Sequence, residues 1–345
     1  MSATTYAIHL RFKSPVHFGN VGLDYGKSEH TIHNDTIYAA IFNTLALIGQ
    51  EDKIPSDGDS LGYALSSCLP YYFDGKQHVH FFPRPFSQSF THIDDHLSGG
   101  SDGRKALKKI SYLDKGHFFQ LCEHGFLHPD ISAINGAFYT DHNDFTADFR
   151  LFYSEVYPRV RVSRNEGEDA KPYYIERLFF FDSGDKYAGL FFLFYGTKED
   201  LNLVKTALNI LEDEGFGTDR KIGHGQFTYE VTPFDLPAFT GNSAVSLGLL
   251  SPPDRLWIKN HVATNNQCGY QLKRRGGWIT SQGLSGFRKN DLQMFAPGSV
   301  FSLSTSSVTV EGVMHNVLPK SINVENKHPV WRAGKTMLFP LNLKP

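Results

Sequence analysis

The alternation of apolar and polar residues predicts a β-strand from Tyr6 to Lys13. Side chains of a strand point alternately to its two faces, so a period of two assigns each residue to a side. One face would be apolar and buried, and the other basic. The apolar side holds Tyr6, Ile8, Leu10 and Phe12, and the basic side holds His9, Arg11 and Lys13.

Two segments show the three-to-four-residue spacing that is typical of amphipathic helices. The first is residues 33–49, where Asn34 or Asp35 would cap the helix and Gly49 would end it. The second runs from Lys198 to Glu214 behind a Thr197 cap. The expected apolar stripes are Ile37, Ile41, Leu45 and Ile48 in the first helix, and Leu201, Val204, Leu208 and Leu211 in the second.

Three further stretches predict strands. Residues 157–181 indicate two β segments around the tip "RNEGEDAKP", and "AGLFFLF" and "QFTYEV" indicate one strand each. The order strand, helix, hairpin, helix, strand is the βαββαβ pattern of a ferredoxin-like unit. Residues 51–150 would be a long insertion in it, with a short strand near 78–82 and a polar loop at 94–109.

A polar, proline-containing stretch, "TPFDLPAFTGNS", predicts a linker between two domains. We therefore expect an N-terminal domain at 1–235 and a second α+β domain at 236–345, where short β segments alternate with Gly and Pro.

Composition narrows the class of protein. The 345 residues are 40% hydrophobic and 14% aromatic, which favours a β-rich or α+β fold. The formal net charge is −2, so a nucleic-acid partner would require local clusters of basic residues. The three cysteines form no metal-binding pair or disulfide pattern. With no signal-like N-terminus and no apolar run of membrane-spanning length, we expect a cytoplasmic protein that contacts no membrane.

The segment "GFGTDRKIGHGQF", Gly215 to Phe227, holds four glycines and two adjacent cations. A dinucleotide fingerprint would need a glycine where Arg220 stands, and a P-loop needs a spacing that this chain lacks at "GKS" and "GKT". Two interpretations remain open. Either backbone N–H groups of the loop cradle an anion with the help of Arg220 and Lys221, or the loop is a plain turn after a helix.

Two other clusters are basic, and one carries aromatic residues between its cations. This combination suits single-stranded RNA, whose phosphates bind cations and whose bases stack on rings. Each cluster taken alone is more often a solvated face. The first cluster is Arg159, Arg161 and Arg164; the second is Lys273, Arg274, Arg275, Arg288 and Lys289, with Tyr270, Trp278 and Phe287.

Histidines offer a weaker signal. His17, His30 and His33 lie near the first helix and are candidates for the acid and base of a metal-independent ribonuclease. The run "HIDDHL" imitates a metal site, although isolated core or surface histidines explain both features. We expect no metal, no cofactor and no small-molecule substrate.

Several segments together resemble one family. They are "FKSPVHFGN", "HNDTIYAAIF", "KALKKISYL", the 157–181 run, the glycine loop, "KRRGGWI" and "HPVWRAGKTMLFPL". In this combination the chain resembles the RAMP superfamily of CRISPR proteins, and within it the family of subunit 4 of the type III-A Csm effector complex. The resemblance runs nearly end to end, and the glycine loop alone marks only the superfamily.

The resemblance implies two ferredoxin-like (RRM-like) domains and a non-catalytic role in antiviral defence. Such subunits hold the repeat-derived 5′ handle of the guide RNA and contact the large polymerase-like subunit and the first backbone subunit. A β-hairpin thumb of the family would come from "RNEGEDAKP" or the 92–104 loop. The expected RNA-binding residues are Gly215, Gly217, Thr218, Arg220, Lys221, Gly223, Gly225, Arg159, Arg161, Arg164, Arg274, Arg275, Trp278 and Arg288.

Two alternatives belong to other classes. One is a RAMP endoribonuclease that processes the guide precursor by histidine acid–base chemistry. The other is a scaffold that contacts only proteins.

Overall fold

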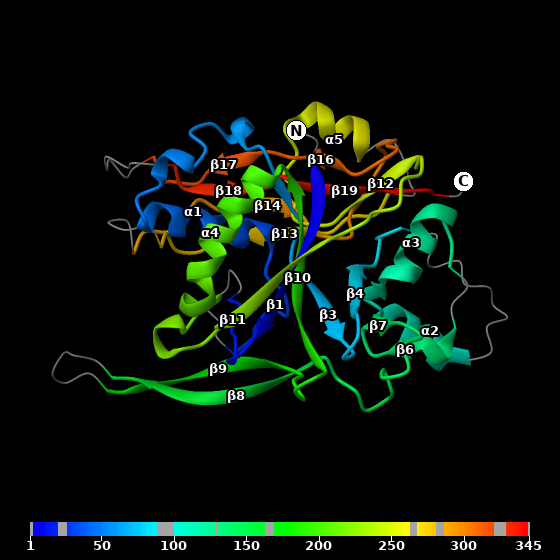
Figure 1. Ribbon diagram of the computed structural model, residues 1–345, viewed down its shortest axis with the longest axis horizontal. Helices are drawn as coiled ribbons and strands as arrows, with labels where there is room; N and C mark the ends of the chain where they lie inside the picture. The colour runs from blue at the N-terminus through cyan, green and yellow to red at the C-terminus, as the bar shows by residue number, and fades with distance from the viewer. Residues whose placement is uncertain are drawn as a thin grey trace.

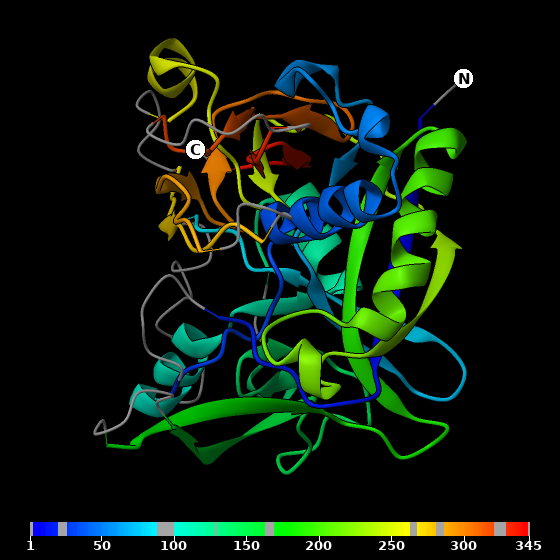
Figure 2. The same cartoon turned by 90° about the vertical axis from the view of Figure 1, so that its left-hand side faces the viewer.

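The computed structural model shows a mixed α+β protein built around one large sheet (Figure 1). Of the described helices, α1 and α4 lie side by side over one face of that sheet, as Figure 2 shows. The described residues are 3–19, 26–87, 100–127, 130–162, 169–262, 268–280, 286–320 and 329–343. The α-helices are α1 (Asn34–Leu47), α2 (Gly100–Lys109), α3 (Lys115–His124), α4 (Lys198–Glu214) and α5 (Arg255–His261).

The large sheet has nine strands in the order β11-β1-β10-β3-β4-β5-β7-β6, with β2 paired to β10. Each of its first four strands runs antiparallel to its neighbours among them. Its strands are β1 (Thr4–Phe12), β2 (Ala64–Leu65), β3 (Leu69–Phe73), β4 (His78–Pro83), β5 (Tyr112–Asp114), β6 (Ile134–Asn135), β7 (Phe138–Tyr139), β10 (Tyr187–Gly196) and β11 (Phe227–Pro233).

The predicted strand–helix–strand–strand–helix–strand order is present, but with a different second strand. The members are β1, α1, β3, β10, α4 and β11. The second strand, β3, therefore lies within residues 51–150, which we expected to be an insertion. The predicted hairpin is instead a separate two-stranded ribbon, β8 (Phe152–Arg161) and β9 (Lys171–Phe180). It projects from the body along the bottom of Figure 1.

The C-terminal part forms small sheets, of which the four-stranded one packs on the large sheet and β18 packs against α1. A four-stranded sheet has the order β15-β12-β19-β16, and β13–β14 and β17–β18 are two-stranded. The strands of the C-terminal part are β12 (Ser243–Ser246), β13 (Leu272–Arg275), β14 (Leu292–Phe295), β15 (Val300–Phe301), β16 (Thr309–Glu311), β17 (Met314–Asn316), β18 (Trp331–Ala333) and β19 (Thr336–Leu341).

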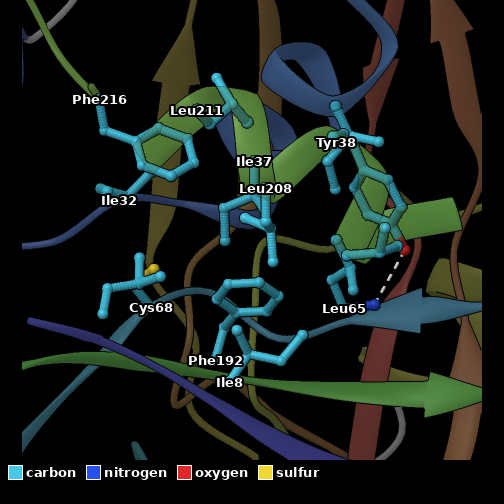
Figure 3. Packing of buried hydrophobic residues seen from close by; sticks show 14 of the residues in the cluster. Ile8, Ile32, Ile37, Tyr38, Leu65, Cys68, Phe192, Leu208, Leu211 and Phe216 are labelled. Atoms are coloured by element: carbon cyan, nitrogen blue, oxygen red, sulfur yellow. Dashed lines mark hydrogen bonds between the residues drawn. The ribbon is translucent and has the colours of Figure 1, made fainter. Parts of the chain in front are cut away.

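Both faces of the central strands are buried. In β10, Leu190, Phe192 and Phe194 pack under α1 and α4, while Phe191 and Leu193 pack against the C-terminal strands. Strands covered on both faces read as continuous apolar runs, which explains "AGLFFLF". Figure 3 shows the first of these cores, where the hydroxyl of Tyr38 accepts a hydrogen bond from the Leu65 N–H at 2.9 Å.

The predicted basic face of the first strand is wrong at its centre. β1 lies between β10 and β11, and His9 is 2% exposed. The Nε2 atoms of His9 and His80 are 2.8 Å apart, and the His9 ring stacks on His78 at 4.0 Å between centroids. Among the charged residues expected there, Arg11 reaches the surface and forms an ion pair with Asp182 at 2.8 Å.

The helix ends distinguish a correct cap prediction from a wrong one. Thr197 caps α4 through a capping box with Asp200, as predicted. For α1 the N-cap is His33, which makes no side-chain cap bond, so the prediction of Asn34 or Asp35 is wrong. Both are buried within the first turn because they bind the C-terminal part of the chain. Within the described residues, none of the helices is long and apolar enough to cross a membrane.

Candidate nucleic-acid interface

The glycine loop, residues 215–225, connects α4 to β11 and folds back on the segment after β1. The Gly225 N–H donates to Pro15 O at 2.9 Å, and the Thr218 N–H to His17 O at 3.0 Å. Gly225 has φ +79°, and a Cβ there would lie 1.9 Å from the Phe216 carbonyl oxygen. No side chain fits at that distance, so this glycine permits a close backbone crossing.

The glycines therefore do not form the predicted N–H cradle. The Gly215 N–H donates to Leu211 O at 2.8 Å and ends α4, and the Gly223 N–H donates to Arg220 O at 3.0 Å. Together with Gly225, three of the four glycines donate their backbone N–H groups to hydrogen bonds within the protein. Their role is conformational, and any anion at the loop must be bound by other groups.

Two cations of the loop and hairpin, Arg159 and Arg220, are paired with carboxylates. Arg159 of β8 lies 3.1 Å from the Asp219 carboxylate, and Arg220 lies 3.6 Å from Glu214. Asp219 has φ 64°, which makes it the non-glycine residue with a left-handed backbone within the described ranges. Arg159 thus joins the projecting hairpin to the loop. Lys221 is exposed at the loop surface.

A groove of about 270 Å³ brings the loop together with α1 and the C-terminal part. We call it the phosphate groove, after the ligand proposed below. Predicted residues that line it are Gly215, Gly217, Thr218, Arg220 and Arg275, and the other residues used in the argument are Asp35, Lys289 and Arg332.

The charge of the groove is centred on a buried ion cluster. Asp35, 2% exposed, accepts from Arg275 Nε at 2.9 Å and Nη2 at 3.0 Å, and also from Arg332 Nη1. Burial raises the pKa of Asp35, but the two guanidiniums outweigh it and hold that pKa well below its usual range. One carboxylate therefore faces two permanent cations.

Two observations show that this positive charge is not fully balanced. Arg332 is 5% exposed, and its Nε has no hydrogen-bond partner among the residues that the structure describes. Burial, with Arg332 and Arg275 nearby, lowers the pKa of Lys289 to about 8. Burial is the largest cause of this lowered pKa; the two guanidiniums add to it and the Asp35 carboxylate opposes it. The described lining of the groove thus holds four cationic side chains and one carboxylate.

The remaining predicted residues occupy three different settings. Arg274 is exposed and forms an ion pair with Asp291, which directly precedes the neighbouring strand β14. Trp278 is 51% exposed, and the Arg288 guanidinium lies 5.0 Å from its ring centroid. Arg161 is exposed at the end of β8, and Arg164 lies outside the described residues.

Arg275 is a correction to the predicted set. We expected it to extend an open track with Arg274, but it is 7% exposed and engaged by Asp35 and Thr36. It contributes charge from beneath the groove. Successive residues of a strand point to opposite faces, which is why Arg274 and Arg275 differ so sharply.

Sequence reasoning missed the roles of Asp35, Lys289 and Arg332. Asp35 was interpreted as a helix cap, and Arg332 stood unremarked in "VWRAGK". The available signal was an acidic residue in the first turn of a predicted helix, which requires a cationic partner when it is buried. Nothing in the spacing told that the partners stand 240 and 297 positions away.

The three candidate catalytic histidines do not share a site. His17 Nδ1 contacts Glu176 O at 2.8 Å, and His30 lies against the Phe152 ring. His33, at the start of α1, contacts the Ser67 hydroxyl. The "HIDDHL" run lies outside the described residues, as do most of the 92–104 loop and residues 163–168 of the other thumb candidate.

One group within the described residues could hold a metal ion: Asp114, His117 and Asp141. The Asp114 carboxylate already caps α3 by accepting from the His117 N–H, and it binds His117 Nδ1 at 2.9 Å. Its oxygens are thus used in structure, and we assign no metal there.

Comparisons with known proteins agree with this architecture. The family model of the RAMP superfamily matches residues 9–228, so the chain belongs to that superfamily. The model of the CRISPR Csm4 C-terminal domain matches residues 240–341, so this part of the chain is similar to that domain.

Curated relatives carry the same family name. The CRISPR system Cms protein Csm4 of Mycobacterium tuberculosis (strain CDC 1551 / Oshkosh) is 23% identical over 328 residues, covering 94% of both chains. The Csm4 of Streptococcus thermophilus is 21% identical over 346 residues, covering 98% of this chain and 100% of that one.

Solved structures show the same fold. A chain of the Csm3-Csm4 subcomplex in the type III-A CRISPR-Cas interference complex gives a TM-score of 0.62 at 18% identity, covering 98% of this chain and 99% of that one. A chain of the Csm1-Csm4 cassette in complex with cA4 gives 0.58 at 18% identity, covering 99% of each.

Proposed function

We propose that this protein is the non-catalytic RNA-binding subunit of a type III-A CRISPR interference ribonucleoprotein. It would hold the 5′ handle of the guide RNA, with phosphates in the phosphate groove. The observation that carries this proposal is a groove where two arginines face one aspartate, and where the buried Nε of Arg332 has no hydrogen-bond partner in the described part of the chain. Membership of the RAMP superfamily supports RNA as the source of the phosphates.

The surface around the groove suits single-stranded RNA. Arg220 and Lys221 stand at the loop, and Trp278 with Arg288 offers an exposed ring and cation to an unstacked base. Arg159 and Arg161 continue the basic track onto the hairpin, which we propose as the thumb. The two family-model regions would correspond to two ferredoxin-like (RRM-like) domains.

The partners of relatives suggest its neighbours. Relatives occur in solved structures with Csm1 and with Csm3. We propose that this chain likewise joins the large polymerase-like subunit to a backbone subunit. Retention of both subunits by a tagged copy of this chain is the test, and the loss of both would contradict the proposal.

The salt dependence of RNA binding tests the groove. Arg220→Ala with Lys221→Ala should weaken binding of the guide handle, because two phosphate contacts disappear. The slope of log K against log salt should fall by about one to two units. Fluorescence anisotropy at several salt concentrations measures it, and RNA recovered from each titration should remain full length, as expected of a non-catalytic subunit.

The matched control removes the same charge elsewhere. Arg255 and Lys259 are exposed on α5 and do not line the phosphate groove. Arg255→Ala with Lys259→Ala should leave the slope near that of the parent. An equal fall in both variants would mean that only net charge matters. RNA that the parent protein cleaves and a His→Ala variant leaves intact would favour the endoribonuclease alternative.

A further inference from the structure

Lys289 is a cation of the phosphate groove that no carboxylate of the described residues pairs with. Its backbone N–H donates to Gly277 O at 2.9 Å, and the N–H of the next residue, Asn290, donates to Val317 O at 2.9 Å. The root of the side chain is therefore fixed, and the side chain is half-buried and lines the groove. Within the described part of the chain, its ammonium group forms no hydrogen bond or ion pair. This amine is thus free to meet a ligand in the groove.

The charged neighbours of this amine are mostly cations. Arg275 and Arg332 lie buried beneath the groove and are held there by Asp35, and Arg220 is partly exposed on its lining. The two buried guanidiniums are engaged, so they act on a ligand through their field and not by direct contact. The groove measures about 270 Å³, which is room for a small anion. Such an anion would be drawn to the positive field without displacing the Asp35 contacts.

The same surroundings favour the neutral form of the amine. Burial, followed by the charge of Arg332, lowers the pKa of Lys289 to about 8, although Asp35 opposes the shift. At pH 7.5 about a quarter of such an amine is neutral, compared with about one part in a thousand for a lysine of ordinary pKa. The neutral amine is the nucleophilic form. The groove thus combines a nucleophile with the charge that attracts an anionic reagent.

We propose that Lys289 is a modification site that accepts acyl groups from small acyl phosphates, and that its acylation weakens the binding of RNA in the phosphate groove; the second part rests on the proposed function. The neutral Nζ attacks the carbonyl carbon and forms an amide. The bond between that carbon and the phosphate oxygen breaks, and the departing phosphate takes up the amine proton. Because the amide is uncharged, the groove loses one of the four cationic side chains of its described lining.

Acetyl phosphate and the full chain test the modification site. The protein is incubated with acetyl phosphate at pH 7.5 and cut with a protease specific for acidic residues, and acetylated lysines are then quantified by mass spectrometry over time. Lys289 should be acetylated at least about tenfold faster than Lys259, because more of its amine is neutral. Lys259 is an exposed lysine of α5 that does not line the groove. Equal rates at the two lysines would overturn the inference.

A second acyl donor separates attraction of the anion from reactivity of the amine. The ester p-nitrophenyl acetate is uncharged, so the field of the groove does not concentrate it. The ratio of Lys289 to Lys259 acetylation should therefore be higher with acetyl phosphate than with the ester. Arg220→Gln should lower the acetyl phosphate rate at Lys289 about twofold, because the groove loses a charge. The control Arg255→Gln, on α5, should not change it. An identical ratio with both donors would exclude acyl phosphates as the preferred reagent.

RNA binding tests the regulatory part. The RNA that co-purifies with the protein should protect Lys289 from acetylation. Treatment with acetyl phosphate should weaken RNA binding and lower the slope of log K against log salt by about one unit. In Lys289→Arg, whose guanidinium is not acetylated, the same treatment should cause no further loss of affinity. A loss of equal size in treated Lys289→Arg would assign the effect to other lysines and overturn this part.

The acetylation experiment needs no RNA, so the two proposals can fail separately. Fast acetylation of Lys289 in a protein that binds no RNA would support the modification site and contradict the proposed function. Slow acetylation of Lys289 in a protein that binds RNA would overturn the modification site and leave the proposed function in place.

Discussion

At the scale of single residues, Asp35 controls the candidate site. Its carboxylate is the acceptor that fixes Arg275 and Arg332, which come from distant parts of the chain. A buried charge without its partner costs far more than an exposed one. The position of the two guanidiniums in the phosphate groove therefore depends on this one side chain.

Asp35→Asn should destabilise the protein by about 3–5 kcal/mol, because two buried guanidiniums lose their counter-charge. Urea denaturation measures the free energy of unfolding. Asp291→Asn is the matched control, since it breaks the exposed pair with Arg274 and should cost at most about 1 kcal/mol. Similar losses of unfolding free energy in the two variants would show that the Asp35 cluster does not stabilise the fold more than an exposed ion pair does.

Two buried histidines predict how stability depends on pH. Burial, with His78 nearby, lowers the pKa of His9 to about 3, and burial with His9 and His78 lowers that of His80 to about 2. In the unfolded chain both titrate near 6.5. The unfolded state therefore binds protons first as the pH falls, and stability drops below about pH 6.5, by up to about 1.4 kcal/mol per pH unit for each histidine.

Denaturation at pH 7.5, 5.5 and 4.5, values chosen on either side of about 6.5, should show this loss. His33 and His78, whose pKa values are also lowered, act in the same direction, while His117, whose pKa is raised by Asp114, opposes them. His9→Phe with His80→Phe should flatten the decline. An unchanged slope in that variant would assign the acid sensitivity to other groups.

At the scale of elements, the glycine loop is a backbone crossing that few sequences can make. Gly225 and Gly223 have similar φ values, +79° and +83°, but a Cβ meets Phe216 O at Gly225 and nothing within 4 Å at Gly223. The two positions thus separate the cost of a left-handed backbone from the cost of a clash.

Gly223→Ala should lose about 1–2 kcal/mol, the cost of a left-handed backbone for a side chain. Gly225→Ala should lose more, because the crossing with Phe216 must also open. Urea denaturation gives the ranking, and RNA binding should fall further in Gly225→Ala if the loop shapes the groove. Equal losses at both positions would mean that the crossing relaxes freely.

Local patterns predicted some elements well and partners poorly. The prediction of a polar loop at 94–109 is wrong over its described part, because Gly100–Lys109 forms the helix α2. The α4 helix was predicted with both ends and its cap, because all the determinants lie within 18 residues of one another, from Thr197 to Glu214. The second strand of the unit, β3, was missed because its sequence "LPYYF" shows no alternation and is buried on both faces. The hairpin was found, but its separation from the sheet was not.

At the scale of the whole molecule, the two halves share a core. Phe191 and Leu193 of the large sheet pack in one cluster with Val245 and Phe339 of the C-terminal part. Composition predicted the α+β class, but it carried no information on this stacking. The phosphate groove could be predicted only in part for the same reason: Arg220 belongs to a recognisable motif, whereas the position of Arg332 depends on how the halves dock.

The separation of Asp35 from Arg332 in the sequence also determines when, during translation, the groove can be completed. A nascent chain that has just completed the glycine loop still lacks both guanidiniums of the groove, since Arg275 and Arg332 have yet to be translated. Until then Arg220 is the one cation of the described groove lining that has been translated. The groove gains its full positive charge when β18 reaches α1, so an unfinished chain should bind RNA more weakly than the complete one.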